Sequence, residues 1–207
     1  MIPINQLGQF PASLFILIAT IATTLMAWRN AELLRSFLLH PYTCVRHNRW
    51  HTLLTSGLIH KDGPHLIFNM LSFYFFAFPL ELALGPVRLA ILYIASVILS
   101  DIPTVIRRRN DPDYFCLGAS GGVTAVIFSF IIYFPFTQIG LLFIPIGIPA
   151  PLFGLLYIAY TWYASRDPNS HINHSAHLWG GISGLLLTLI MNPSAYRAFL
   201  RQLQELF

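Results

Sequence analysis

The sequence predicts an all-α, multi-pass membrane protein that forms one bundle of six transmembrane helices. Of its 207 residues, 56% are hydrophobic and only 10% are charged, and the mean hydropathy is +0.63. So few charges cannot cover a water-soluble globule, and the apolar residues fall in several long runs. At roughly 20 residues a span plus loops, the length suits a single membrane domain over residues 1–207.

The first span is expected at residues 11–28, an apolar run that ends at an interfacial Trp-Arg pair. The stretch that follows is too apolar for a free coil, and residues 33–39 suit a short amphipathic helix at the membrane surface. The remaining spans are predicted at residues 65–84, 87–99, 120–134, 151–164 and 176–191, with a short amphipathic tail at 195–207.

Prolines and polar residues set several of these boundaries. The span at 87–99 is expected to end before Ser100, Asp101 and Pro103. The apolar stretch 137–149 contains two prolines, so we expect a connection that follows the membrane surface.

Ser120 lies among glycines in the segment 118–122, at the start of an apolar run. Residues 120–134 make about 22 Å of helix, which is shorter than the roughly 30 Å hydrocarbon core. This helix is therefore expected to begin below the membrane surface. Backbone at that depth must be buried in protein or face water, which predicts a wet recess at Ser120.

Polar side chains within apolar spans are costly in a membrane, so they are candidates for function. His65 and Asn69 are four residues apart and share one face of a helix, and His177 lies at the start of the last span. An imidazole beside a serine hydroxyl takes its proton and activates it as a nucleophile. We therefore predict that Ser120 and His177 are the catalytic pair.

Glycines are expected to bring these two residues together. Gly180 and Gly184 form a small-xxx-small pattern that permits close helix packing, and Gly121 and Gly122 are expected to supply the facing surface. Gly118 belongs to the same set of packing glycines.

A nucleophilic serine also needs hydrogen-bond donors for the oxyanion that forms on attack. The backbone N–H groups at the helix N-terminus and the side chains of His65 and Asn69 are the candidates. No carboxylate is expected as a third catalytic member, because Glu81 and Asp101 lie near other helix ends. A Ser-His dyad is predicted rather than a triad.

These segments resemble the motifs of the rhomboid intramembrane serine proteases. Residues 118–121, Gly-Ala-Ser-Gly, are similar to the family's Gly-x-Ser-Gly motif, and residues 65–69 to its His-x-x-x-Asn motif. Residues 176–184 match the Ala-His-x-x-Gly-x-x-x-Gly element of the last helix, and 81–85 resemble the structural Glu-x-x-x-Gly element. The motifs follow the family's order across about residues 50–187.

The resemblance implies a six-helix rhomboid-like bundle with Ser120 as nucleophile and His177 as general base. It also implies an oxyanion hole made by His65, Asn69 and the Ser120 backbone N–H. The implied partners are transmembrane protein substrates and the lipid bilayer, and the implied reaction uses no metal or cofactor. The expected location is a multi-pass position in the cell membrane.

The sequence departs from the family in two places. The family often has a tyrosine four residues after the serine, stacked on the catalytic histidine, whereas this chain has Thr124. Another group must therefore orient His177. The Trp-Arg pair frequent in the family's first loop is Trp50-His51 here.

The distribution of cations conflicts with the family's orientation in the membrane. With six spans, nine of the 12 Lys and Arg residues lie on the Ser120 side, and Arg88, Arg197 and Arg201 lie on the other. The positive-inside rule places the more basic side in the cytoplasm, whereas the family resemblance implies that it faces outward. We favour the outward orientation, because the first loop is expected to pack into the membrane.

Two other functions fit parts of the pattern. One is a catalytically inactive rhomboid-like protein that binds membrane clients. Retention of Ser120 and His177 argues against it, and Thr124 keeps it open. The other is a redox protein with His65 and His177 as axial haem ligands.

Metal and nucleic-acid binding have little support. His171, His174 and His177 recur every three residues, but no carboxylate or cysteine accompanies them at ligand spacing. The net charge of +4 comes from scattered cations and not from a basic stripe. The other histidines are expected to be surface or loop residues: His40, His47, His51 and His60.

Overall fold

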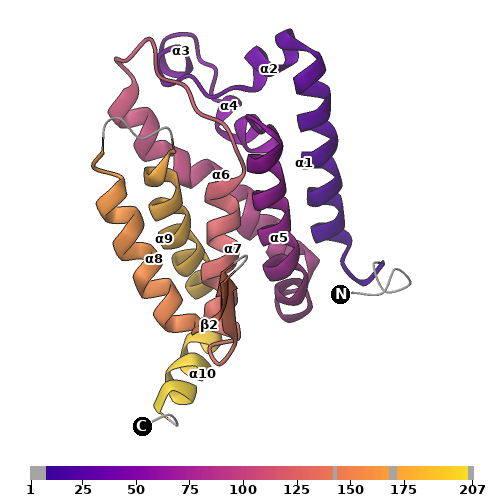
Figure 1. Cartoon of the computed structure of the whole chain (residues 1–207), viewed down its shortest axis with the longest axis vertical. Helices are drawn as coiled ribbons and strands as arrows, with labels where there is room; N and C mark the ends of the chain where they lie inside the picture. The colour runs from indigo at the N-terminus through magenta and orange to yellow at the C-terminus, as the bar shows by residue number, and fades with distance from the viewer. Residues whose placement is uncertain (1–7, 142–143, 168–171, 205–207) are drawn as a thin grey trace.

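The computed structural model describes residues 8–141, 144–167 and 172–204, and most of them are helical (Figure 1). His171, the first seven residues and the last three residues of the expected tail lie outside the described residues. Among the described helices, three are long and apolar enough to cross a membrane: α1 (Pro11–Arg29), α5 (Gly63–Leu84) and α6 (Pro86–Arg108). The prediction of a helical, multi-pass membrane protein is confirmed.

The other apolar helices are shorter. α7 (Ser120–Tyr133) has 14 residues, and α8 (Ala150–Ala164) has 15. α9 (His174–Met191) is followed, after a bend of 108°, by α10 (Pro193–Gln204). α7 is about 21 Å long at 1.5 Å per residue, shorter than the hydrocarbon core, as the sequence predicted.

α7 is the central helix of the bundle. Every residue from 121 to 132 is buried, and the helix packs against α5, α6, α8 and α9. Figure 1 shows α7 in the middle, with α1 at one edge and α8 toward the other. An apolar helix surrounded in this way is hydrophobic on all sides, which explains why its sequence shows no polar face.

A folded first loop covers the end of the bundle where α7 begins (Figure 1). It contains three short helices and a 3₁₀ turn, and Asn30 caps the first of them by accepting the backbone N–H groups of Glu32 and Leu33 at 3.0 Å. This first helix, predicted at 33–39, begins two residues earlier. The elements are α2 (Ala31–Phe37), α3 (Pro41–Arg46), α4 (Thr52–Thr55) and η2 (Ser56–Leu58).

The prediction that the third span ends near residue 99 is wrong. α6 continues through Pro103 to Arg108, and its polar residues Ser100, Asp101 and Thr104 are buried in the bundle. Ser100 Oγ donates to the carbonyl of Val97 at 3.0 Å, and Thr104 Oγ1 donates to Asn173 Oδ1 at 3.2 Å. The Thr104 bond ties the part of α6 beyond Pro103, a residue that removes one backbone hydrogen bond, to the segment that caps α9.

A two-stranded hairpin, which the all-α prediction did not include, joins α7 to α8. β1 (Gln138–Leu141) pairs antiparallel with β2 (Ile144–Pro149), with Ile139 opposite Ile148. β-Branched isoleucines suit a strand, and Pro149 lies at the strand end, where its missing N–H breaks little of the ladder. In place of the expected connection, the described residues on either side of 142–143 form two paired strands.

Candidate active site

Ser120 is the first residue of α7, and its side chain is half-buried. The backbone N–H groups of a helix's first turn lack partners within the helix and point outward from its N-terminus. Ser120 therefore lies beside donors suited to a negative charge.

The first loop holds the segment that leads to Ser120. Leu39 and Cys116 exchange two backbone hydrogen bonds, at 2.9 and 3.2 Å, and the Gly118 N–H donates to the Ser56 carbonyl at 2.9 Å. Gly118 has a φ of +123°, which L side chains rarely adopt. The backbone before the helix is thus hydrogen-bonded to protein, as a segment at membrane depth requires.

His60 connects the same segment to α1. Its Nε2 accepts the Ala119 N–H at 3.3 Å, so the ring proton is on Nδ1, which lies 3.1 Å from Thr24 Oγ1. Thr24 in turn donates to the Leu58 carbonyl at 3.2 Å, and Trp28 Nε1 donates to the His60 carbonyl at 2.8 Å. Burial of the ring, which is 0% exposed, lowers the pKa of His60 to about 3 and keeps it neutral.

The sequence predicted that His60 is a surface or loop residue, and the prediction of a surface position is wrong. It does lie in the first loop, but its side chain is fully buried. The sequence carries no signal for this, because the partners of His60 come from segments distant in the chain.

His65 lies in the first turn of α5, where the Asp62 side chain accepts its backbone N–H at 2.8 Å. Its ring packs against Gly118, where an added Cβ would lie 2.6 Å from Cε1 and 2.8 Å from Nε2. Asn69 is buried one turn later, and its Nδ2 donates to the His65 carbonyl at 3.0 Å. The structure thus places the His65 ring against the glycine two residues before Ser120, while the Asn69 amide bonds to its own helix.

His177 lies in the first turn of α9, and α6 anchors that turn. Asn173 caps α9 by accepting the Ala176 N–H at 3.2 Å, and its Nδ2 lies 3.4 Å from Asp101 Oδ1. Asp101 is therefore buried inside α6 and not at a helix end, and it reaches the cap of α9 and not His177 itself.

Glycines allow the first turns of α7 and α9 to touch. A Cβ added at Gly180 would overlap the Gly121 backbone, and one at Gly184 would overlap the Ala125 backbone. Gly122, expected to face α9, instead faces Val97 and other residues of α6. Ser120 and His177 thus lie on the first turns of two helices whose backbones are in contact. Among the hydrogen bonds of the described residues, none joins the Ser120 hydroxyl to His177.

Tyr157 of α8 is a site residue that the sequence reasoning missed. Its hydroxyl lies 3.2 Å from His177 Nδ1 and 3.3 Å from Thr124 Oγ1. The tyrosine and histidine rings are stacked, with centroids 6.3 Å apart and planes at 19°. Tyr157 was one of several aromatic residues in an apolar run, so nothing local distinguished it.

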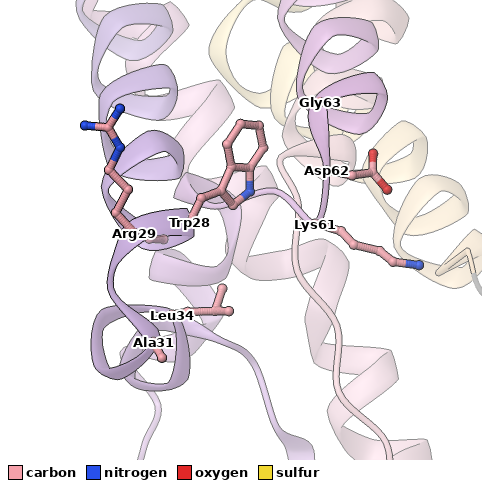
Figure 2. Close-up of a pocket in the computed structure, with 8 residues that line it drawn as sticks. Trp28, Arg29, Ala31, Leu34, Lys61, Asp62 and Gly63 are labelled. Carbon is pink, nitrogen blue, oxygen red and sulfur yellow. The ribbon is translucent and has the colours of Figure 1, made fainter.

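A separate pocket of about 530 Å³ lies where the end of α1 and α2 meet the start of α5. Figure 2 shows the Trp28 ring between α1 and the segment before α5, with the Arg29 and Lys61 side chains pointing away from each other. Neither Ser120 nor His177 lines it. The lining residues are Ala27, Trp28, Arg29, Ala31, Leu34, Lys61, Asp62 and Gly63.

Metal-binding side chains do not gather in the part of the chain that the structure describes. No three His, Cys, Asp or Glu side chains there are placed to hold an ion. The rings of His174 and His177 are 5.9 Å apart, and His171 is outside the described residues.

The family model and the two relatives described here all point to the same protein family. The Rhomboid domain family matches residues 47–194. The chain is 32% identical over 149 residues to the Bacillus subtilis (strain 168) protein named "Putative rhomboid protease YdcA", an alignment that covers 70% of this chain and 69% of that protein. It is 30% identical over 176 residues to "RHOMBOID-like protein 12, mitochondrial" of Arabidopsis thaliana, covering 77% of this chain and 52% of the relative. The chain thus spans about half the length of the plant relative.

The family match extends from the first loop to the start of α10. It includes all of α5, α7 and α9, the helices that carry the predicted site residues. This chain belongs to the rhomboid family.

Proposed function

We propose that the protein is an intramembrane serine endopeptidase that hydrolyses a peptide bond in or near a transmembrane segment of another membrane protein. Ser120 is the nucleophile and His177 the general base. The contact between the N-terminal parts of α7 and α9, where Gly180 packs against the Gly121 backbone, carries the proposal. Membership of the rhomboid family supports it.

The proposed reaction begins when His177 Nε2 takes the proton of the Ser120 hydroxyl as its oxygen attacks the scissile carbonyl. The carbonyl oxygen becomes an oxyanion beside the N–H groups at the start of α7. His177 then gives the proton to the leaving amine, which leaves an acyl ester on Ser120. A water molecule, deprotonated by His177, hydrolyses this ester and restores the serine.

His65 and Asn69 are the proposed side-chain donors to the oxyanion. The His65 ring already packs against Gly118, at the entrance to the helix. Asn69 uses one N–H for the His65 carbonyl, and an amide group has a second N–H to donate. Loss of one such donor typically lowers the rate by about 10²- to 10³-fold.

The Ser120 hydroxyl and His177 form their hydrogen bond when substrate is present. Catalytic hydrogen bonds are often long in substrate-free enzymes and shorten in the Michaelis complex. Glycine-mediated contact of the two helices keeps the required movement small.

The test uses the full-length protein reconstituted in liposomes with a model transmembrane substrate, alongside a fluorophosphonate probe that labels activated serines. We expect the wild type to cleave the substrate and react with the probe, and Ser120→Ala and His177→Ala to do neither. Equal cleavage by wild type and Ser120→Ala would refute the proposal. A wild type that binds substrate but is neither labelled nor active would instead indicate a client-binding rhomboid-like protein.

The proposed base also predicts a pH dependence. His177 accepts a proton only when its ring is neutral, so cleavage should slow as the pH falls through the pKa of His177. A cleavage rate that stays constant into strong acid, down to about pH 3 with the protein still folded, would contradict this role.

A further inference from the structure

The neighbours of His177 suggest how its ring is held. In this chain the residue four positions after the serine is Thr124, which has no aromatic ring to stack on a histidine. Ser120 and Thr124 are one turn apart on the same face of α7, so Thr124 lies one turn deeper in the bundle than the nucleophile. The aromatic ring parallel to His177 comes instead from Tyr157 of α8.

The Tyr157 hydroxyl lies between His177 and Thr124, and the role of His177 as base fixes which group donates each hydrogen bond. A base that uses Nε2 must carry its own proton on Nδ1. The Nδ1–H group then donates to the Tyr157 hydroxyl oxygen at 3.2 Å, and the tyrosine proton is free to point to Thr124 Oγ1 at 3.3 Å. In the opposite arrangement the tyrosine would donate to Nδ1, which would place the proton on Nε2 and prevent His177 from acting as base.

Thr124 suits this arrangement in size and in chemistry. Its side chain is buried, at 2% exposed, and is small enough to leave room for a ring from the neighbouring helix. Its hydroxyl accepts a hydrogen bond that an alanine or valine would leave unmade.

We propose that Tyr157 is a positioning residue that holds His177 in the Nδ1-protonated tautomer, with Thr124 anchoring the tyrosine hydroxyl. The inference rests on the proposed protease function, and it assigns to α8 a part of the site that the rhomboid motifs place on α7. Tyr157 contacts the base and not the substrate, so its loss should lower the rate of the chemical steps and leave substrate binding unchanged.

A merely structural role for Tyr157 is the competing explanation. Its ring also packs against Phe153, with centroids 5.8 Å apart, and Phe128, at 6.0 Å. Tyr157→Phe keeps all of the ring packing and removes only the hydroxyl, so it separates the two roles.

The first experiment compares Tyr157→Phe with Tyr163→Phe, a matched change on an exposed part of α8. We expect Tyr157→Phe to lower kcat and the rate of probe labelling about tenfold, the effect of one lost orienting hydrogen bond, with KM within twofold of the wild type. Tyr163→Phe should change neither. Thr124→Val should lower kcat, and Thr124→Ser, which keeps the hydroxyl, should retain most of it.

The second experiment does not depend on activity. Histidine labelled with nitrogen-15 reports the tautomer of each neutral ring by NMR, and the signal of His177 is assigned by its loss in His177→Gln. We expect the Nδ1–H tautomer in the wild type and a mixture of tautomers in Tyr157→Phe.

The outcomes separate the two proposals. An active wild type with inactive Ser120→Ala, but with unchanged kcat and tautomer in Tyr157→Phe, would overturn the positioning role alone. An inactive wild type would overturn the protease proposal. The tautomer measurement would still decide whether Tyr157 orients His177.

Discussion

Buried His60 joins the first loop, α1 and the segment before Ser120 through hydrogen bonds to both ring nitrogens. Only a neutral ring can accept the Ala119 N–H while donating to Thr24. The folded protein therefore keeps His60 unprotonated at pH values where an exposed histidine is a cation.

This difference predicts a loss of stability in acid. The pKa of His60 is about 3 in the folded state and close to 6.5 in the unfolded chain. Between these values the unfolded state binds more protons, so the free energy of unfolding falls by up to about 1.4 kcal/mol for each pH unit below 6.5. From pH 7.5 to 5, the wild type should lose about 2 kcal/mol more stability than His60→Gln, measured by thermal unfolding in detergent micelles. Parallel pH profiles for the two proteins would contradict this prediction.

Gly118 is a second residue at the candidate site that cannot easily be replaced. Its φ of +123° disfavours any Cβ, and a Cβ would also strike the His65 ring. Gly118→Ala should cost roughly 1–3 kcal/mol of stability and displace His65, so activity should fall as well. Gly63→Ala, where the added Cβ meets nothing within 4 Å, is the control and should be close to neutral. Equal melting temperatures for the two variants would show that the strain at Gly118 has no effect.

The contact between α7 and α9 brings together the helix starts that carry Ser120 and His177, the proposed nucleophile and base. Gly180 and Gly184 approach the backbone of α7 directly, and backbone cannot move aside as a side chain can. Ser129 Oγ and Thr188 Oγ1 add a hydrogen bond between the same helices at 2.5 Å.

Substitution of these glycines should separate the helices. Gly184→Ala places a methyl group into the Ala125 backbone and should cost about 1–3 kcal/mol, as overpacked cores do. Gly181→Ala should cost less, because the added Cβ lies 3.1 Å from the Phe128 ring, which can shift. Thermal unfolding of the two variants measures the difference, and a larger loss in Gly181→Ala would refute this account of the interface.

The motifs located these glycines in the sequence, but only the structure shows what each one faces. Gly184 packs against Ala125, while Gly122 faces α6. Helical periodicity tells which residues share one face of a helix. Which neighbouring helix that face packs against depends on how the helices are placed in the bundle. For the same reason, the extension of α6 past Pro103 was not predictable from local breaking signals.

α1 is attached to the rest of the molecule at both of its ends. Toward the C-terminal end of α1, Thr24 and Trp28 form hydrogen bonds to His60 in the first loop. At its start, Glu81 of α5 accepts the backbone N–H groups of Ala12 and Ser13 at 2.9 and 2.8 Å. The buried carboxylate thus satisfies two free donors of the first turn of α1 and complements the helix dipole.

The loss of this carboxylate should loosen the docking of α1. Glu81→Ala leaves two backbone N–H groups without acceptors, that of buried Ser13 and that of partly buried Ala12, and should destabilise the fold by roughly 2–4 kcal/mol. Glu81→Gln keeps one acceptor oxygen and should cost less. Thermal unfolding gives the energies, and amide hydrogen exchange at Ala12 and Ser13 should rise in Glu81→Ala. Unchanged exchange there would show that other contacts hold α1.

At the scale of the whole molecule, the sequence by itself determined the helical membrane class and the identity of the residues predicted to carry the chemistry. Apolar runs and short motifs are local properties, so they can be read along the chain. Only the tertiary structure decided that His60 is buried, that Asp101 reaches the cap of α9, and that Tyr157 of α8 contacts His177. These contacts join segments distant in sequence, and they exist only because helix packing brings particular faces together.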